Sequence, residues 1–466
     1  MNARNLSKVH VNVHAALATE RQQFVWSTVA QWFQLEITWI FANDSEHSEQ
    51  TIVEIEGSNV AMWQNHGILD ADASANVDIK CAAWRSSDGA TELMLPCMHA
   101  EPLGTKAAGQ GLELGFDPIG ATFWGLSCWS EQHGQCKLDV FGRPTTKHLP
   151  WVRSQKTARF NGKELPMSHQ HHWPWLELMW SSLLTSWGIE VRAGLTFRPT
   201  IDIDVAYKHL GRPRWKSLLL NARDLMSGHW RMGHERSKVL KGAISDPYDT
   251  YADLKEIHNE ESLWWFVLAS NRSAPHDIGL NPDAPALPAL VESLNSSSQP
   301  ASVFWHPGYK AVDDSHVRSA EFERFAGWEG TDSGTVRTHF LRGMPAEWWR
   351  SLEEMGIERD ASLGWARDVG FRAGTSRPFQ AYDVHADRTL KLEIVPIAVM
   401  DMAMSVGLRW SPEEAKRKLD SRMQVVAEVG GLWTSCWHNT SVSEEGSWLG
   451  WRATYVHMVE TARRLA

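Results

Sequence analysis

The sequence predicts an α/β protein whose larger part is built on a mostly parallel β-sheet. From about Leu195 onward, short apolar segments of strand length alternate with longer helical segments. Several helical segments carry start signals, such as Ser411-Pro412, and helices placed between apolar strands imply right-handed βαβ crossovers. Periodicity does not separate an open sheet from a barrel. In either arrangement, ligands are expected at the carboxyl ends of the strands.

The chain has 466 residues, which is long enough for two or three domains. We expect an N-terminal α/β domain of unknown role over residues 1–190 and a second domain over residues 191–466. The first domain starts with short alternating patterns. These predict strands at residues 8–14, 35–41 and 51–56, and a helix at residues 21–34.

Capping residues and helix breakers locate the remaining elements. Asp117 and Pro118 mark the start of a helix within residues 117–132, and a helix that begins at Pro174 is expected to end near Gly188. The second domain is expected to hold strands within residues 195–207, 262–270, 302–309 and 432–438. Its helices are expected within residues 284–300, 345–355 and 411–429.

Composition narrows the classes of partner. The net charge of −10 argues against nucleic acid, because phosphate binding needs a surplus of Lys and Arg. No apolar run approaches the roughly 18 residues of a membrane span, and the first residues lack the apolar region of a signal peptide. We therefore expect a cytoplasmic protein without a membrane span. The five cysteines form no C-x-x-C pair, so neither a disulfide framework nor a cysteine zinc site is expected.

Tryptophan is unusually abundant, with 26 residues. Stacking on sugar rings is one interpretation, because an aromatic face matches the apolar face of a pyranose. Most tryptophans have apolar neighbours, as in Trp264-Trp265 and Trp348-Trp349. This context favours packing in the core.

A group of three histidines, His169, His171 and His172, precedes the helix at Pro174. Their spacing of i, i+2 and i+3 falls in a predicted loop without a nearby carboxylate. We therefore interpret the group as part of a solvated loop and not as a metal-ligand set.

Ionisable residues stand at or just past the ends of four predicted strands: Asp202 and Asp204, His306, Arg337 with His339 and Arg342, and His438. If the strands are parallel, these ends share one rim, so the side chains are expected to converge. Carboxylates and imidazoles are the usual ligands of a hydrolytic divalent metal. A second carboxylate can take a proton from water, and an imidazole can protonate a leaving amine. Taken singly, each residue also has a purely structural or surface interpretation.

At these residues the sequence resembles the NodB-type polysaccharide deacetylases, carbohydrate esterase family 4. It resembles more closely a group of bacterial deacetylase-like proteins with an added N-terminal domain of unknown function. The similar segments include TIDIDVAY, FWHPGY, RTHFLR, GFRAGTSRPFQAYD, PIAVMD and CWHNTSVS, within about residues 117–450. The resemblance implies that residues 191–466 form a distorted (β/α) barrel.

The resemblance also implies catalytic roles. Asp202 would be the base and Asp204 a metal ligand. The family's two aspartates are adjacent, whereas these two have one residue between them, so the reverse assignment stays open. Arg337 would steady the base, Arg372 lies in the region of the fourth family motif, and His438 would be the catalytic acid.

The remaining metal ligands would come from histidines. His306 matches the first histidine of the family's metal motif, but Lys310 stands where the family has the second. His339 is the expected replacement, and His316 is a poorer candidate. The metal implied by the resemblance is zinc or a similar divalent ion.

The function implied is a hydrolase that cleaves the amide C–N bond of an N-acetylated sugar or of a surface-polysaccharide precursor. The alternative is a degenerate deacetylase fold that binds a glycan or another protein in such a pathway, and Lys310 favours this alternative. The Asp204→Ala substitution separates the two, because an enzyme would lose metal and turnover while a binder would keep its ligand.

Overall fold

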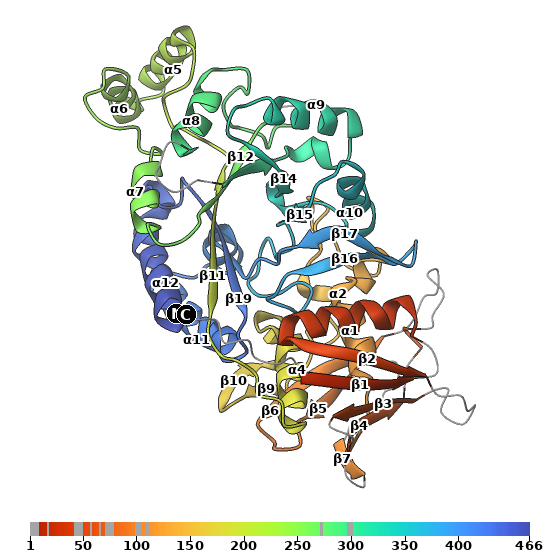
Figure 1. Ribbon diagram of the computed structural model, residues 1–466. Coiled ribbons are helices and arrows are strands. Elements are labelled where there is room, and N and C mark those ends of the chain that lie inside the picture. The colour runs from red at the N-terminus through yellow and green to blue at the C-terminus, as the bar shows by residue number, and fades with distance from the viewer. Residues whose placement is uncertain are drawn as a thin grey trace.

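The structure is a computed structural model that describes residues 9–15, 18–41, 50–55, 58–64, 67–69, 79–97, 105–108, 111–270, 274–295 and 302–466 (Figure 1). It is a mixed α/β protein, and its described strands form three sheets. Two small sheets come from the first 166 residues, and one large sheet comes from residues 196–438.

The first small sheet has the order β2-β1-β3-β4-β8-β7. Its strands are β1 (Val9–Ala15), β2 (Leu35–Phe41), β3 (Gln50–Ile55), β4 (Ser58–Gln64), β7 (Thr105–Ala108) and β8 (Gly111–Leu114). β1 and β2 are parallel and joined by helix α1 (Glu20–Phe33), as the sequence pattern predicts. β3 and β4 are antiparallel to their neighbours β1 and β3, respectively.

The second small sheet has the order β10-β9-β6-β5 and is antiparallel. Its strands are β5 (Lys80–Arg85), β6 (Thr91–Cys97), β9 (Thr157–Phe160) and β10 (Lys163–Pro166). The sequence analysis did not identify these four strands.

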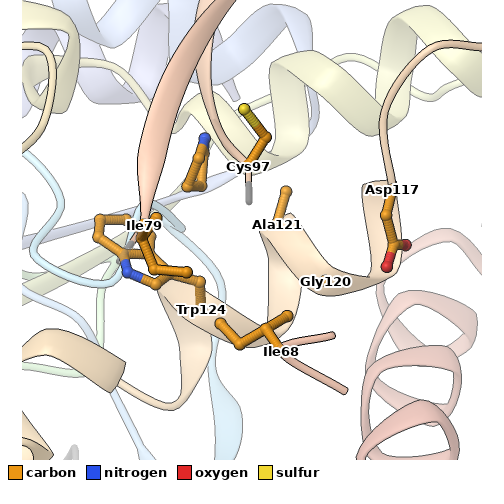
Figure 2. A pocket seen from close by; sticks show the side chains of 8 residues that line it. Ile68, Ile79, Cys97, Asp117, Gly120, Ala121 and Trp124 are labelled. Carbon is orange, nitrogen blue, oxygen red and sulfur yellow. The ribbon is translucent and has the colours of Figure 1, made fainter. Parts of the chain in front are cut away.

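Helix α2 (Pro118–Leu126) is buried along its whole length and contacts β6, α1 and β16. The side chain of Asp117 caps it and Pro118 is its first residue, as predicted. A hollow beside α2 is lined by Ile68, Ile79, Pro96, Cys97, Asp117, Gly120, Ala121 and Trp124 (Figure 2). Its volume of about 10 Å³ has room for about one water molecule, so this hollow is not a ligand site.

Two further helices follow in this part of the chain. α3 (Trp129–Gln132) is a short continuation of α2 after a break at Cys128, whose φ is +49°. α4 (Trp175–Ser186) covers most of the predicted helix from Pro174, and Gly188 follows it at a φ of +80°.

The large sheet has the order β16-β17-β15-β14-β13-β12-β11-β19-β18. Its strands are β11 (Thr196–Ile203), β12 (Trp264–Leu268), β13 (Ser302–His306), β14 (Asp332–Val336), β15 (Arg359–Asp360), β16 (Phe379–Asp383), β17 (Arg388–Ile394), β18 (Val399–Met400) and β19 (Leu432–His438). All neighbours are parallel except β16 and β17. The predicted parallel sheet is therefore present. No pairing among the described residues joins its two edges, so closure into a barrel stays a prediction.

Helices connect these strands and lie on the outer side of the curved row of strands, as α7, α9, α10 and α12 show in Figure 1. Their bounds are α5 (Arg214–Met226), α6 (Trp230–Leu240), α7 (Tyr251–Ile257), α8 (Ala286–Asn295), α9 (Ser315–Ala326), α10 (Pro345–Glu354), α11 (Pro412–Glu428) and α12 (Trp451–Leu465). Ser411 caps α11 with its side chain, as its sequence signal predicts. Among the described helices, none is both long and apolar enough to cross a membrane.

One continuous hydrophobic core extends from β1 to α12. Thirteen tryptophan side chains are at most 2% exposed, in agreement with the packing interpretation of this residue type. Hydrogen bonds also link the first 190 residues to the rest, such as the bond of 2.9 Å from the Trp32 indole N–H to the carbonyl of Pro378. The division into two domains at residue 190 stays a prediction.

Candidate metal centre

The carboxyl ends of four parallel strands bring Asp204, His306, His339 and His438 together. Asp204 follows β11 directly, His306 ends β13, His339 lies three residues past β14, and His438 ends β19. Asp204 Oδ1 lies 3.1 Å from His306 Nε2. Its other oxygen, Oδ2, lies 3.3 Å from His339 Nε2 and 3.4 Å from His438 Nε2. Three imidazoles therefore point one nitrogen each at a single carboxylate.

The opposite nitrogen of each imidazole has an acceptor. His306 Nδ1 lies 2.5 Å from the carbonyl oxygen of Arg337. His339 Nδ1 lies 2.8 Å from Asp277 Oδ1, and His438 Nδ1 lies 2.9 Å from Asp401 Oδ1. A carbonyl and two carboxylates can only accept, so each Nδ1 carries hydrogen and donates it. Each Nε2 therefore faces Asp204, which is how metal-ligating histidines are oriented.

The pKa values show that the centre favours positive charge. Burial alone would raise the pKa of Asp204, but the charges of His339 and His438 hold it well below its ordinary value. Burial would lower the pKa of His339, yet Asp204 and Asp277 raise it to about 9. In the same way, Asp401 and Asp204 outweigh burial and raise the pKa of His438. Lone pairs and a carboxylate that face one another need a proton or a cation between them.

The geometry fits a divalent cation. The ligand atoms of Asp204, His306 and His339 all lie within 4.8 Å of one another. A tetrahedral zinc site has neighbouring ligand atoms about 3.3 Å apart, since its Zn–N and Zn–O bonds are about 2.0–2.2 Å. The distances of 3.1 and 3.3 Å from Asp204 to the two histidines match that spacing. Asp204 is 22% exposed, so the centre has access to solvent.

A second carboxylate, Asp202, lies beside the centre and is held by a buried guanidinium. Arg337 Nη1 donates to Asp202 Oδ1 over 2.8 Å, and the Cys436 thiol donates to the other oxygen over 3.3 Å. Burial would raise the pKa of Asp202, but the charge of Arg337 and the nearby His306 keep it below its ordinary value. Asp202 is therefore ionised and able to accept a proton at neutral pH.

The turn after His339 has an unusual backbone. Phe340 and Leu341 have φ values of +68° and +52°, in the left-handed region that residues with side chains seldom adopt. Each such residue costs about 1–3 kcal/mol and is found mostly where function requires it. Here the turn holds the His339 ring against Asp204. The centroids of the His339 and Phe340 rings are 4.7 Å apart.

Four other residues considered in the sequence analysis lie outside this group. Arg372 forms a buried ion pair of 2.5 Å with Glu131, so its hydrogen bonds go to the first part of the chain. Lys310 and His316 are exposed. Arg342 donates to the carbonyls of Tyr309 and Phe141. The roles that we expected for the site residues remain proposals.

The interpretation of His171 and His172 as part of a solvated loop is wrong. Both are buried, and Asp368 supplies the carboxylate that the local sequence lacks. Asp368 lies 3.1 Å from His171 Nε2 and 2.8 Å from His172 Nε2. However, Arg422 donates to His172 Nδ1 over 2.7 Å, so the proton of His172 is on Nε2 and faces Asp368. This arrangement favours a hydrogen-bonded cluster over a metal site.

A larger cavity lies near Phe340, and none of the residues that line it belongs to the metal centre. Its volume is about 510 Å³, which suits one or two sugar units, and residues 137–141, 144–147 and 365–368 line it. One lining ring, Phe141, lies 5.2 Å from Phe340. Lys137, Asp139, Lys147 and Arg367 provide charged and hydrogen-bonding groups. The first part of the chain thus contributes one part of the lining, and another part includes Asp368, the partner of His171 and His172.

The sequence analysis missed Asp277 and Asp401, the two carboxylates that orient His339 and His438. Asp401 directly follows the two-residue strand β18, within the PIAVMD segment, so a carboxylate at a strand end was available as a signal. Asp277 lies in a loop, 62 residues from His339, and offers no such signal.

Comparisons with known proteins add little to this geometry. No family model matches the chain, and no curated protein matches its sequence. One solved structure, described as a "putative glycoside hydrolase/deacetylase" from Parabacteroides distasonis, has 13% identity and a TM-score of 0.35. The match covers 59% of this chain and 68% of that one. We draw no conclusion from a likeness of this size and base the functional proposal on the geometry of the centre.

Proposed function

We propose that the protein is a metal-dependent hydrolase that removes acetyl groups from an N-acetylated sugar or polysaccharide precursor. The observation that carries the proposal is the convergence of His306, His339 and His438 on Asp204. Every Nδ1 proton in this group is assigned to an acceptor, and every Nε2 faces inward. Because His438 lies outside the group whose ligand atoms are mutually close, we assign the metal to Asp204, His306 and His339.

The other polar residues have roles that follow from their contacts. A divalent cation, zinc in our proposal, would polarise an acyl carbonyl and lower the pKa of water. Asp202 is the base, because Arg337 keeps it ionised in a buried position. His438 is the acid, because Asp401 and Asp204 raise its pKa and keep a proton on the ring for a leaving amine.

The substrate class is supported by the cavity near Phe340. A volume of about 510 Å³ and a lining of charged, hydroxyl and aromatic side chains suit a sugar better than a small apolar ligand. Asp139 and Arg367 line it from two different segments of the chain. The acetamido group would reach the centre past Phe340.

The test is acetate release from oligomers of N-acetylglucosamine by the full chain supplied with zinc. The wild type should release acetate. The Asp204→Ala variant should lose both zinc and turnover. Asp202→Asn should keep zinc and lose turnover by about 10²- to 10⁴-fold, the usual contribution of a general base. Circular dichroism checks that each variant folds.

The matched control is Asp420→Asn, because Asp420 forms a similar pair of 2.8 Å with His457 at the surface. This variant should keep both zinc and turnover. Acetate release that persists in Asp204→Ala would refute the proposal. Glycan binding without acetate release, retained in Asp204→Ala, would instead support the glycan-binding alternative.

A further inference from the structure

Helix α5 (Arg214–Met226) presents its apolar side to solvent. Successive residues of a helix are about 100° apart, so Trp215, Leu218, Leu219, Leu225 and Met226 fall within one stripe about 120° wide. These side chains are 63%, 68%, 61%, 55% and 82% exposed. The helix is therefore inverted relative to an ordinary surface helix, whose apolar stripe faces the core.

The inward side of α5 is polar, and an ion pair links it to α6. Asp224 and Ser217 are buried there. Arg236 of α6 donates to Asp224 over 2.7 Å and to Asn221 over 2.6 Å. Because polar contacts hold α5 against α6, the apolar stripe is not needed to build the hairpin and remains available for another surface.

The hairpin of α5 and α6 projects from the rest of the molecule, at the end of the large sheet away from the small sheets (Figure 1). It follows β11, the strand that positions Asp202 and Asp204. Its base is held by Lys208 and His209, which pair with Glu235 of α6. More than half of the exposed large apolar side chains of the described residues lie between residues 215 and 244.

The charge of the hairpin is opposite to that of the chain. Residues 212–241 contain eight Lys or Arg and two acidic residues, whereas the whole chain has a net charge of −10. Both acidic residues are engaged in ion pairs, Asp224 with Arg236 and Glu235 with Lys208. On the helical wheel, Arg214 flanks one side of the apolar stripe, and Lys216 and Arg223 flank the other.

We propose that the α5–α6 hairpin docks the protein on an anionic lipid surface, with the stripe of α5 entering the headgroup region. An apolar stripe rich in Trp and Leu between rows of cations is the pattern of helices that lie in a membrane interface. A second copy of the chain fits less well. Pairing two α5 stripes would bring their cations together, whereas paired helices place opposite charges along the contact. This docking surface does not depend on the proposed hydrolase activity.

Sedimentation of the full chain with vesicles tests the proposal. The protein should bind vesicles of phosphatidylcholine with about one-quarter phosphatidylglycerol, and bind pure phosphatidylcholine at least tenfold more weakly. Joint Lys216→Gln and Arg223→Gln substitutions should weaken binding to the anionic vesicles by roughly 25-fold, about fivefold for each cation. Joint Leu218→Ser and Leu219→Ser substitutions should weaken binding at least tenfold.

The matched control is Leu449→Ser, because Leu449 is equally exposed, at 71%, but lies outside the hairpin. It should bind vesicles like the wild type. Quenching of tryptophan fluorescence by brominated lipid reports insertion and should fall in Trp215→Ala, with Trp230 of α6 as the other exposed tryptophan of the hairpin. The proposal would be overturned if the wild type did not bind anionic vesicles. It would also be overturned if the two-serine variant bound them as strongly as the wild type. If light scattering showed that the wild type is a dimer and that the two-serine variant is a monomer, the stripe would instead be a self-association surface.

Discussion

Replacing Asp277 with Asn tests whether His339 is a metal ligand. Asp277 is buried and touches the proposed metal centre only through His339 Nδ1, at 2.8 Å. Its other contacts are the Ser270 hydroxyl, at 2.7 Å, and the Tyr309 N–H, at 3.1 Å. The substitution keeps the size of the side chain and removes its charge, so it changes the support of the imidazole and leaves the ligand in place.

The expected effect is a loss of zinc affinity of about 10- to 100-fold, the usual result of removing the partner that orients a ligating histidine. A hydrogen bond to a charged acceptor is about 1–2 kcal/mol stronger than one to a neutral acceptor, which corresponds to about 5- to 30-fold and overlaps this range. The pH dependence should change as well. The pKa of His339 is about 9, so protons compete with zinc and the affinity of the wild type should rise with pH up to about 9. In Asp277→Asn this rise should end at lower pH.

Competition with a fluorescent chelator, repeated at several pH values, measures both effects. Asp420→Asn is the control, because it removes the charge of an equivalent pair at the surface, and its zinc affinity should match that of the wild type. If Asp277→Asn bound zinc as tightly as the wild type and with the same pH dependence, His339 would not be a ligand and the assignment of the centre would fail.

Three further predictions concern stability. Arg337→Met leaves the buried carboxylate of Asp202 without its partner, so it should lower the free energy of unfolding by about 3–5 kcal/mol in urea titrations. A loss below about 1 kcal/mol would contradict the importance of this buried pair. Burial would raise the pKa of Glu261, but bonds from His258 and Arg463 lower it to about 2. This stabilisation is present above pH 4.5 and is lost as the pH falls through about 2. Glu261→Gln should therefore cost about 1–2 kcal/mol at pH 7 and progressively less as the pH falls below 4.5. A cost independent of pH would refute this. Gly370 has a φ of +99°, and a Cβ added there would collide with the backbone of residues 171 and 172. Gly370→Ala should therefore lower the stability of the protein by about 3 kcal/mol or more in thermal unfolding. An unchanged Tm would refute this close approach of the backbone.

Four of the nine strands of the large sheet, β11, β12, β13 and β19, could be predicted from the sequence, because they are short apolar runs between well-marked helices. The predicted strand at residues 432–438 matches β19, and the helix at 411–429 matches α11 with its Ser411 cap. The second small sheet was harder to predict. β5, β6, β9 and β10 alternate weakly, and the pairing of β6 with β9 connects residues that are far apart in the sequence, such as Thr91 and Phe160.

The site was partly predictable for a related reason. Asp204, His306 and His438 directly end or follow strands, and parallel strands bring such positions to one rim. Long-range partners give no local signal. Asp368 is 196 residues from His172, so the sequence around the histidines suggested a solvated loop while the fold buries them against a carboxylate.

The inverted helix α5 shows a different limit of pattern reasoning. Its apolar spacing is that of an ordinary amphipathic helix, and the pattern alone indicates that the stripe faces the core. Only the buried contacts of Asp224 and Arg236 show that the polar side faces inward.

An anomalous-difference map at the zinc edge, from a crystal of the zinc-loaded full chain, tests the central claim most directly. We expect one strong peak about 2.0–2.2 Å from a carboxylate oxygen of Asp204, from His306 Nε2 and from His339 Nε2. A map without a peak there would contradict the account, and so would a peak found instead between His171, His172 and Asp368.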